Sequence, residues 1–252
     1  MPQAPLPPAP DAVLFDAGLT LIHPSGDVLT EELAAAGHTG VDPARATTAL
    51  VLAAEARHLT LPAGTGGTEK VARTFAALLG LDPEAASPAV LSALSRPDLY
   101  RDIDPEAAST LRELREQGLT LGVISNSEGT VREELRQAGL LPYLELVVDS
   151  TVVGYEKPDP RIYRHALDLL GIEGERCWYV GDGLVNDVLG SLRSGFGHGV
   201  LYDRFAAYAH LPHIPRITAL SQLPELVGAA RGHHRTPTTT SPSTASTALR
   251  VR

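Results

Sequence analysis

Short runs of hydrophobic residues alternate with amphipathic segments along the chain. Five of these runs predict β-strands, at residues 12–15, 119–124, 144–148, 177–180 and 199–202. From the second run onward, the spacing leaves room for one helix between consecutive strands. Strands that are apolar throughout and separated by helices are typical of a parallel sheet covered on both faces. The pattern therefore predicts an α/β fold with a Rossmann-like parallel sheet as its core.

Asp-Pro pairs mark the beginning of four predicted helices. The Asp side chain can cap a helix, and proline suits the first helical position because the missing N–H has no partner there. The pairs lie at residues 42–43, 82–83, 104–105 and 159–160. Gly118 and Gly171 predict the ends of the last two helices.

One stretch interrupts the alternation of strands and helices. Residues 24–97 follow the first strand and contain several helical patterns but no convincing strand. The stretch is too long for a loop, so we predict an inserted helical domain and a core formed by residues 11–23 and 98–228. Residues 1–10 are rich in proline, and residues 229–252 are rich in threonine, serine and proline. Both segments are predicted to be disordered tails.

Composition and charge narrow the functional classes. The chain has 252 residues and a formal net charge of −9, which argues against a basic nucleic-acid binder or a binder of anionic membranes. The single cysteine, Cys177, excludes an internal disulfide and suits a reducing compartment. The sequence also lacks a signal-peptide pattern and a membrane-spanning apolar run. We expect a cytoplasmic monomer or homodimer with no nucleic-acid or membrane partner.

Polar residues follow four of the predicted strands. They are Asp16, Ser125, Asp149 and Asp182, and Asp187 comes five residues after the last of them. Ligands of open α/β sheets bind at the carboxyl ends of the strands. Taken alone, Asp187 is also compatible with a helix cap. Three of these carboxylates lie at the ends of two strands. If the two strands are neighbours, the carboxylates would repel one another without a cation between them, and hard oxygen ligands suit Mg²⁺.

Four motifs in this order resemble the haloacid dehalogenase superfamily, in the branch with a helical cap inserted after the first core strand. They are residues 16–21 (DAGLTL), 122–126 (GVISN), 154–160 (GYEKPDP) and 180–187 (VGDGLVND). The composition points to the third motif as well. Of the 21 basic residues only two are lysines, and one of these, Lys157, lies in that motif. A lysine in an arginine-rich chain indicates a position that requires an ammonium group.

The resemblance implies hydrolysis of a small phosphorylated metabolite through an aspartyl-phosphate, with Mg²⁺ as the cofactor. Asp16 would be the nucleophile, and Lys157 would stabilise the transferring phosphoryl group. The implied phosphate-binding residues are Thr20, Ser125, Asn126 and Lys157. The implied metal ligands are Asp16, the backbone carbonyl of Gly18, Asp182 and Asp187. The helical domain would close over the substrate as a cap and determine specificity.

The first motif departs from the family pattern at one position. Phosphatases of this superfamily usually carry a second Asp two residues after the nucleophile as a general acid, and here that residue is Gly18. Loss of a general acid typically costs about 10²–10⁴ in rate. His23 could replace the acid or be a loop histidine without a role. Alternatively, the substrate has a good leaving group, or the protein binds phosphate without turnover.

A C–halogen hydrolase is a further alternative, because the dehalogenases of this superfamily also lack the second Asp. They lack the metal-binding acids of the fourth motif as well. Asp182 and Asp187 are present here, which favours phosphoryl chemistry over dehalogenation.

Overall fold

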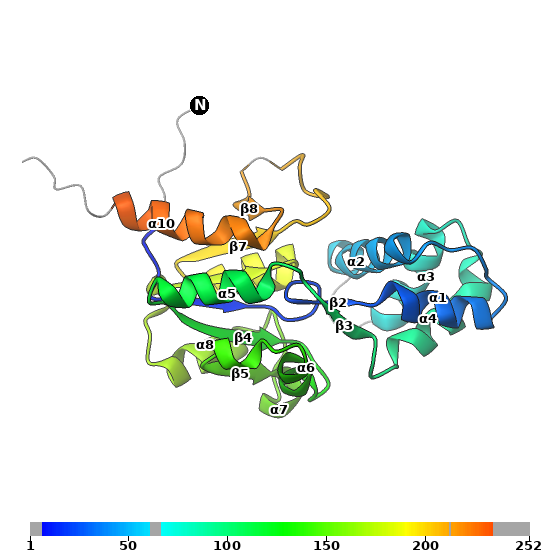
Figure 1. Ribbon diagram of the computed structural model, residues 1–252, viewed down its shortest axis with the longest axis horizontal. Coiled ribbons are helices and arrows are strands. Elements are labelled where there is room, and N and C mark those ends of the chain that lie inside the picture. Colours follow the sequence, from blue (N-terminus) through cyan, green and yellow to red (C-terminus); the bar gives the residue numbers. More distant parts are fainter. Residues whose placement is uncertain (1–6, 61–66, 212, 234–252) are drawn as a thin grey trace, which may run out of the picture.

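The computed structural model describes residues 7–60, 67–211 and 213–233, which form a parallel sheet flanked by helices and a separate helical bundle (Figure 1). The sheet has the order β5-β4-β1-β6-β7-β8, and all of its strand pairs are parallel. The strands are β1 (Ala12–Phe15), β4 (Thr120–Ser125), β5 (Leu146–Asp149), β6 (Cys177–Gly181), β7 (His198–Tyr202) and β8 (Arg216–Ile217). The predicted α/β fold is therefore confirmed.

The central strands are apolar throughout because both of their faces are buried. Successive side chains of a strand point to opposite faces of the sheet. In β1, Val13 and Phe15 pack into one hydrophobic core, whereas Ala12 and Leu14 pack into another. All four side chains are fully buried.

Helices cover both faces of the sheet (Figure 1). On the face of Val13 and Phe15 lie α5 (Ala107–Glu116), α6 (Val131–Gln137) and α10 (Leu223–His233). The other face is covered by α8 (Pro160–Leu170), which packs against Leu14 and Tyr179. Shorter segments complete this core: η1 (Leu141–Tyr143), α7 (Ser150–Val153), η2 (Gly174–Arg176), η3 (Leu184–Leu189), α9 (Gly190–Arg193) and η4 (Leu220–Gln222).

Four helices form a bundle with its own hydrophobic core, which we call the helical unit. They are α1 (Gly26–Ala35), α2 (Pro43–Thr60), α3 (Gly67–Leu78) and α4 (Pro83–Leu94). Their buried side chains include Leu29, Leu50 and Phe75. Both connections to the sheet run through the antiparallel pair β2 (Ile22–Pro24) and β3 (Tyr100–Ile103). Figure 1 shows the helical unit beside the core, beyond this pair of strands.

Several boundaries differ from the sequence-based predictions. Residues 229–233 belong to α10, where Ala230 is fully buried, rather than to a tail. At the other end, the Trp178 indole N–H donates to the carbonyl of Pro8, so the described part of residues 1–10 contacts the core. The remaining residues of both predicted tails lie outside the described residues. Helix α5 begins at Ala107, not after the 104–105 pair.

The predicted caps at Asp82 and Asp159 are confirmed, because each Asp side chain accepts from backbone N–H groups at the start of its helix. Asp82 accepts from two backbone N–H groups of α4, and Asp159 accepts from the N–H of Arg161. Gly171 ends α8 in the left-handed conformation, with φ 63°. Within the described residues, no helix has both the length and the apolar character needed to cross a bilayer.

Candidate active site

The sheet brings the predicted site residues to one edge. Phe15 pairs with Val123 of β4 and with Val180 of β6, so the three central strands are in register. Asp16 directly follows β1, Ser125 is the last residue of β4, and Asp182 follows β6. Because parallel strands end at the same edge, these polar side chains gather there.

Three carboxylates and one ammonium group form the centre of the site. Ligand oxygens of Asp16, Asp182 and Asp187 all lie within 4.8 Å of one another. The Lys157 Nζ donates to Asp16 Oδ1 and to Asp187 Oδ1, at 2.7 Å in both cases. Lys157 also lies 3.2 Å from the hydroxyl of Tyr179. The cluster therefore contains one ammonium group and three acidic groups. Its excess negative charge is of the kind that a divalent cation would compensate.

Burial and mutual repulsion shift the proton equilibria of these groups. Burial raises the pKa of Asp16 to about 6, with Lys157 opposing the shift and Asp187 adding to it. Burial and the nearby Asp16 raise the pKa of Asp182 well above its usual value. Burial alone would lower the pKa of Lys157, but the two carboxylates that it contacts raise it. Lys157 therefore remains an ammonium group at neutral pH.

The loop after β6 fixes Asp187 through backbone contacts. The N–H of Gly183 donates to Asp187 Oδ2 at 2.7 Å. A Cβ on Gly181 would lie 2.4 Å from the carboxyl carbon of Asp187, so this position must be glycine. Asp187 lies inside the π-helical segment η3 rather than at a helix cap. Such segments are frequent at functional sites.

Two of the predicted phosphate ligands hold other site residues in place. The amide of Asn126 accepts from the backbone N–H of Lys157 at 2.7 Å and donates to the Lys157 carbonyl at 2.9 Å. The hydroxyl of Thr20 accepts from the N–H of Asp182 at 3.1 Å and lies 3.5 Å from Asp182 Oδ1. Ser125 is buried at the end of β4, and its hydroxyl has no hydrogen bond within the described residues.

Gly18 and His23 lie in the connection between β1 and the helical unit. A Cβ on Gly18 would meet the Tyr100 ring at 3.5 Å, an ordinary contact. His23 lies on β2 with 3% of its surface exposed, and its Nε2 is 3.1 Å from Asp104 Oδ2. This enclosed position does not fit a free loop histidine. It also does not fit a histidine whose side chain can reach a leaving group.

A pocket beside the acidic cluster lies between the helical unit and the core. Asp182 and Leu19 form its inner wall, Glu55 of α2 forms another, and Arg204 and Tyr208 come from the loop after β7. The buried Glu55 carboxylate accepts from the Tyr208 hydroxyl and, at 3.3 Å, from the N–H of Leu184. These contacts join the two units directly over the site.

The sequence analysis did not single out Glu55, Arg204 or Tyr208, three of the polar residues that line this pocket. A signal existed for Arg204, because it lies just after the predicted strand at residues 199–202, where ligands bind in α/β sheets. Glu55 interrupts an alanine-rich helix, which is a weak signal by itself. Its contact with Tyr208 spans 153 residues and appears only in the folded chain.

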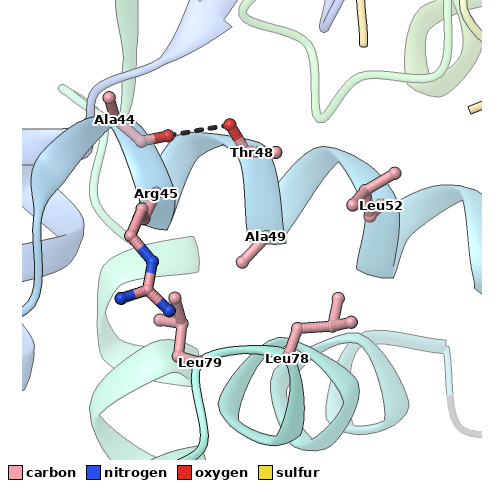
Figure 2. A pocket seen from close by; sticks show the side chains of 7 residues that line it. All are labelled: Ala44, Arg45, Thr48, Ala49, Leu52, Leu78 and Leu79. Atoms are coloured by element: carbon pink, nitrogen blue, oxygen red, sulfur yellow. Dashed lines mark hydrogen bonds between the residues drawn. The ribbon is translucent and has the colours of Figure 1, made fainter. Parts of the chain in front are cut away.

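A second hollow lies within the helical unit, between α2 and α3 (Figure 2). Its wall includes Ala49, Leu52 and Leu78, and its polar members are Arg45 and Thr48. The Thr48 hydroxyl is already bonded to a carbonyl of its own helix. None of the described residues that line this hollow is acidic, so we assign it no part in the chemistry of the cluster.

Comparison with known proteins agrees with the motifs. The model of the haloacid dehalogenase-like hydrolase family matches residues 10–195. The glyceraldehyde 3-phosphate phosphatase of Methanothermobacter thermautotrophicus is 34% identical over 132 residues, which are 49% of this chain and 58% of the relative. The phosphoserine phosphatase of Thermus thermophilus is 41% identical over 92 residues, which are 36% of this chain and 37% of the relative. The chain thus matches less than two thirds of the length of each of these relatives.

Solved structures share the fold along most of the chain. The putative HAD-hydrolase YfnB from Bacillus subtilis, bound to magnesium, has a TM-score of 0.64 and 18% identity, covering 86% of this chain and 98% of that one. The HAD phosphatase from Thermococcus onnurineus has a TM-score of 0.56 and 23% identity, with the same coverage of both chains. Together with the four motifs and the acidic cluster, the family match shows that this chain belongs to the haloacid dehalogenase-like hydrolases.

Proposed function

We propose that this protein is a phosphatase that hydrolyses a small phosphorylated metabolite through an aspartyl-phosphate at Asp16. The observation that carries the proposal is the contact of one ammonium group, Lys157, with both Asp16 and Asp187 at the strand ends, beside Asp182. Two similar proteins are named as phosphatases of small metabolites, glyceraldehyde 3-phosphate and phosphoserine. Family and site chemistry therefore support the same reaction class.

In this reaction each residue of the site has a separate role. A carboxylate oxygen of Asp16 attacks phosphorus, forming a bond from phosphorus to Asp16 as the ester bond to the leaving group breaks. Lys157 and the hydroxyl of Ser125 donate hydrogen bonds to the phosphoryl oxygens. In the second step, water attacks phosphorus and releases inorganic phosphate, which restores Asp16. Thr20 and Asn126 act through Asp182 and Lys157, whose backbones they hold.

The acidic cluster fits a magnesium ion. Ligand oxygens of the buried Asp16 and Asp187 and of the partly buried Asp182 lie within 4.8 Å of one another. Among the described residues, Lys157 is the one ammonium group in contact with two of them. This donor set suits a hard divalent cation. Asp16, Asp182, Asp187 and the carbonyl of Gly18 would hold the ion. When bound, Mg²⁺ would neutralise charge on the nucleophile and on the phosphoryl group.

The helical unit serves as a cap over this site. Glu55 of α2 reaches the loop of Asp182 through the N–H of Leu184 and reaches the β7 loop through Tyr208. A closed cap excludes water and presents residues to the leaving group. With Gly18 in place of the general acid, esters with good leaving groups are the favoured substrates.

Hydrolysis of p-nitrophenyl phosphate with Mg²⁺ and with EDTA, on wild type and Asp16→Asn, tests the proposal. We expect turnover that requires Mg²⁺ and is lost in the variant, because p-nitrophenolate leaves without an acid. Residual activity above about a tenth of wild type would remove Asp16 as the nucleophile. Dehalogenases of this superfamily also lack the second Asp, so halide release from 2-haloacids without phosphatase activity would replace this proposal by C–halogen hydrolysis.

A further inference from the structure

The ammonium group of Lys157 has three N–H donors, and all three are used inside the protein. Two of them are given to the carboxylates of Asp16 and Asp187, at 2.7 Å in both cases. The third is given to the hydroxyl of Tyr179, at 3.2 Å. Lys157 can therefore bind a phosphoryl oxygen only when one of these contacts is exchanged, and the following inference rests on the proposed function, which requires that exchange.

The two carboxylate contacts of Lys157 are the costly ones to give up. A hydrogen bond from an ammonium to a carboxylate gains from the charge of both partners, whereas the hydroxyl of Tyr179 is neutral and more distant. Asp16 and Asp187 are both buried. Release of either one would leave a buried carboxylate oxygen without its cation. The contact with Tyr179 is therefore the one that a phosphoryl oxygen can replace at the least cost.

The hydroxyl of Tyr179 keeps a partner when Lys157 turns away. Its proton is donated to the carbonyl of Ile124 at 2.8 Å, so it meets Lys157 only as an acceptor. The ring is fully buried and makes edge-on contacts with Tyr163 and Phe196, at 5.7 and 5.8 Å between ring centroids. These contacts fix the hydroxyl in place, whereas the four-carbon stem of a lysine is flexible. The ammonium group can therefore leave the hydroxyl, and the hydroxyl does not follow it.

We propose that the hydroxyl of Tyr179 holds the third donor of Lys157 in the resting enzyme and that a phosphoryl oxygen displaces it. Tyr179 is then a positioning residue that lowers the affinity for the substrate and for the phosphate product alike, which favours release of the product. Because the hydroxyl competes with the ligand, its removal should tighten phosphate binding. A hydroxyl that only supported the fold would leave phosphate binding unchanged or weaken it when removed.

The variant Tyr179→Phe tests this role, because it removes the hydroxyl and keeps the ring with its packing. Inorganic phosphate is titrated into wild type and variant by calorimetry with saturating Mg²⁺. We expect the variant to bind phosphate about twofold to tenfold more tightly, the range of one net hydrogen bond. The KM for p-nitrophenyl phosphate should fall by a similar factor while kcat changes less, because the lost contact opposes the bound substrate and the transition state equally.

Tyr163→Phe is the matched control. Tyr163 is fully buried in the same group of aromatic rings, but its hydroxyl donates to the carbonyl of Asn186. This control should keep the wild-type affinity for phosphate. Unchanged or weaker binding in Tyr179→Phe overturns the inference, as does an equal gain in both variants.

Asp16-dependent hydrolysis of p-nitrophenyl phosphate separates this inference from the proposed function. If turnover persists and Tyr179→Phe does not bind phosphate more tightly, only the role of Tyr179 fails. If Tyr179→Phe binds phosphate more tightly but wild type shows no turnover, only the phosphatase activity fails. Absence of both phosphate binding and turnover in wild type would overturn both.

Discussion

The glycine that replaces the usual general acid is not required by the backbone, so the acid can be restored. In the turn after Asp16, the left-handed conformation falls on Leu19, with φ 66°, and not on Gly18. A Cβ at position 18 would lie 3.5 Å from Cε1 and 4.0 Å from Cδ1 of Tyr100. Since these are ordinary contacts, Gly18→Asp should fold, with the free energy of unfolding changed by about 1 kcal/mol or less.

The gain from the restored acid depends on the leaving group. A general acid contributes about 10²–10⁴ in rate, or roughly 3–5 kcal/mol of transition-state stabilisation at 1.4 kcal/mol per factor of ten. We expect this gain for alkyl phosphates and little gain for p-nitrophenyl phosphate. The assay is kcat/KM for a series of phosphate esters plotted against the pKa of the leaving alcohol. The steep wild-type dependence should become shallow in Gly18→Asp.

Gly18→Ala separates the acid from the added side chain, because it introduces the same Cβ without a carboxyl group. It should keep the steep wild-type dependence and the wild-type stability. The reasoning is refuted if Gly18→Asp folds but retains the steep dependence, or if wild type already shows a flat one. A flat dependence in wild type would mean that another group already supplies the proton.

Three further variants test the contacts of the site. Lys157→Met leaves the buried carboxylates of Asp16 and Asp187 without their cation. We therefore expect the free energy of unfolding, measured in urea, to fall by about 3–5 kcal/mol. An unchanged unfolding midpoint would contradict this. Asn126→Ala removes both hydrogen bonds to the Lys157 backbone. It should lower kcat and reduce the free energy of unfolding by about 1–3 kcal/mol. A change in KM alone would point to direct phosphate binding by Asn126. Burial opposes ionisation of Asp104, but hydrogen bonds from His23, Tyr202 and the N–H of Glu106 hold its pKa below the usual 3.8. Wild type should therefore be more stable than Asp104→Asn above pH 3.8. This difference in stability should shrink as the pH falls through the lowered pKa of Asp104 in the folded protein. A difference that grows on acidification would contradict this sign.

Five of the six strands of the sheet could be predicted because burial on both faces leaves a continuous apolar run, as in Ala12–Phe15. The sixth strand, β8, is only two residues long and leaves no such run. The pair β2 and β3 could not be predicted either. Ile22–Pro24 is three residues long and ends in proline, and three of the four residues of Tyr100–Ile103 are exposed. Their pairing depends on the helical unit, which brings together segments that are far apart in the sequence.

The charged centre of the site could be predicted because strand ends and sequence motifs locate single residues. The roles of Thr20 and Asn126 could not, since their partners depend on the path of two loops. The sequence motif predicts Thr20 as a phosphate ligand, and the structure adds that its hydroxyl accepts from the N–H of Asp182. Arg204 and Glu55 meet in one pocket only when the helical unit lies against the core. Contacts of that kind have no local sequence pattern.

Chemical trapping of the phosphorylated enzyme tests the central claim most directly. Wild type is mixed with p-nitrophenyl phosphate and Mg²⁺, quenched in acid and reduced with borohydride, which converts an aspartyl-phosphate to homoserine. Peptide mass spectrometry should find homoserine at position 16 in the quenched enzyme and only aspartate in a control without substrate. Turnover without modification at Asp16, or modification of another carboxylate, would contradict the account.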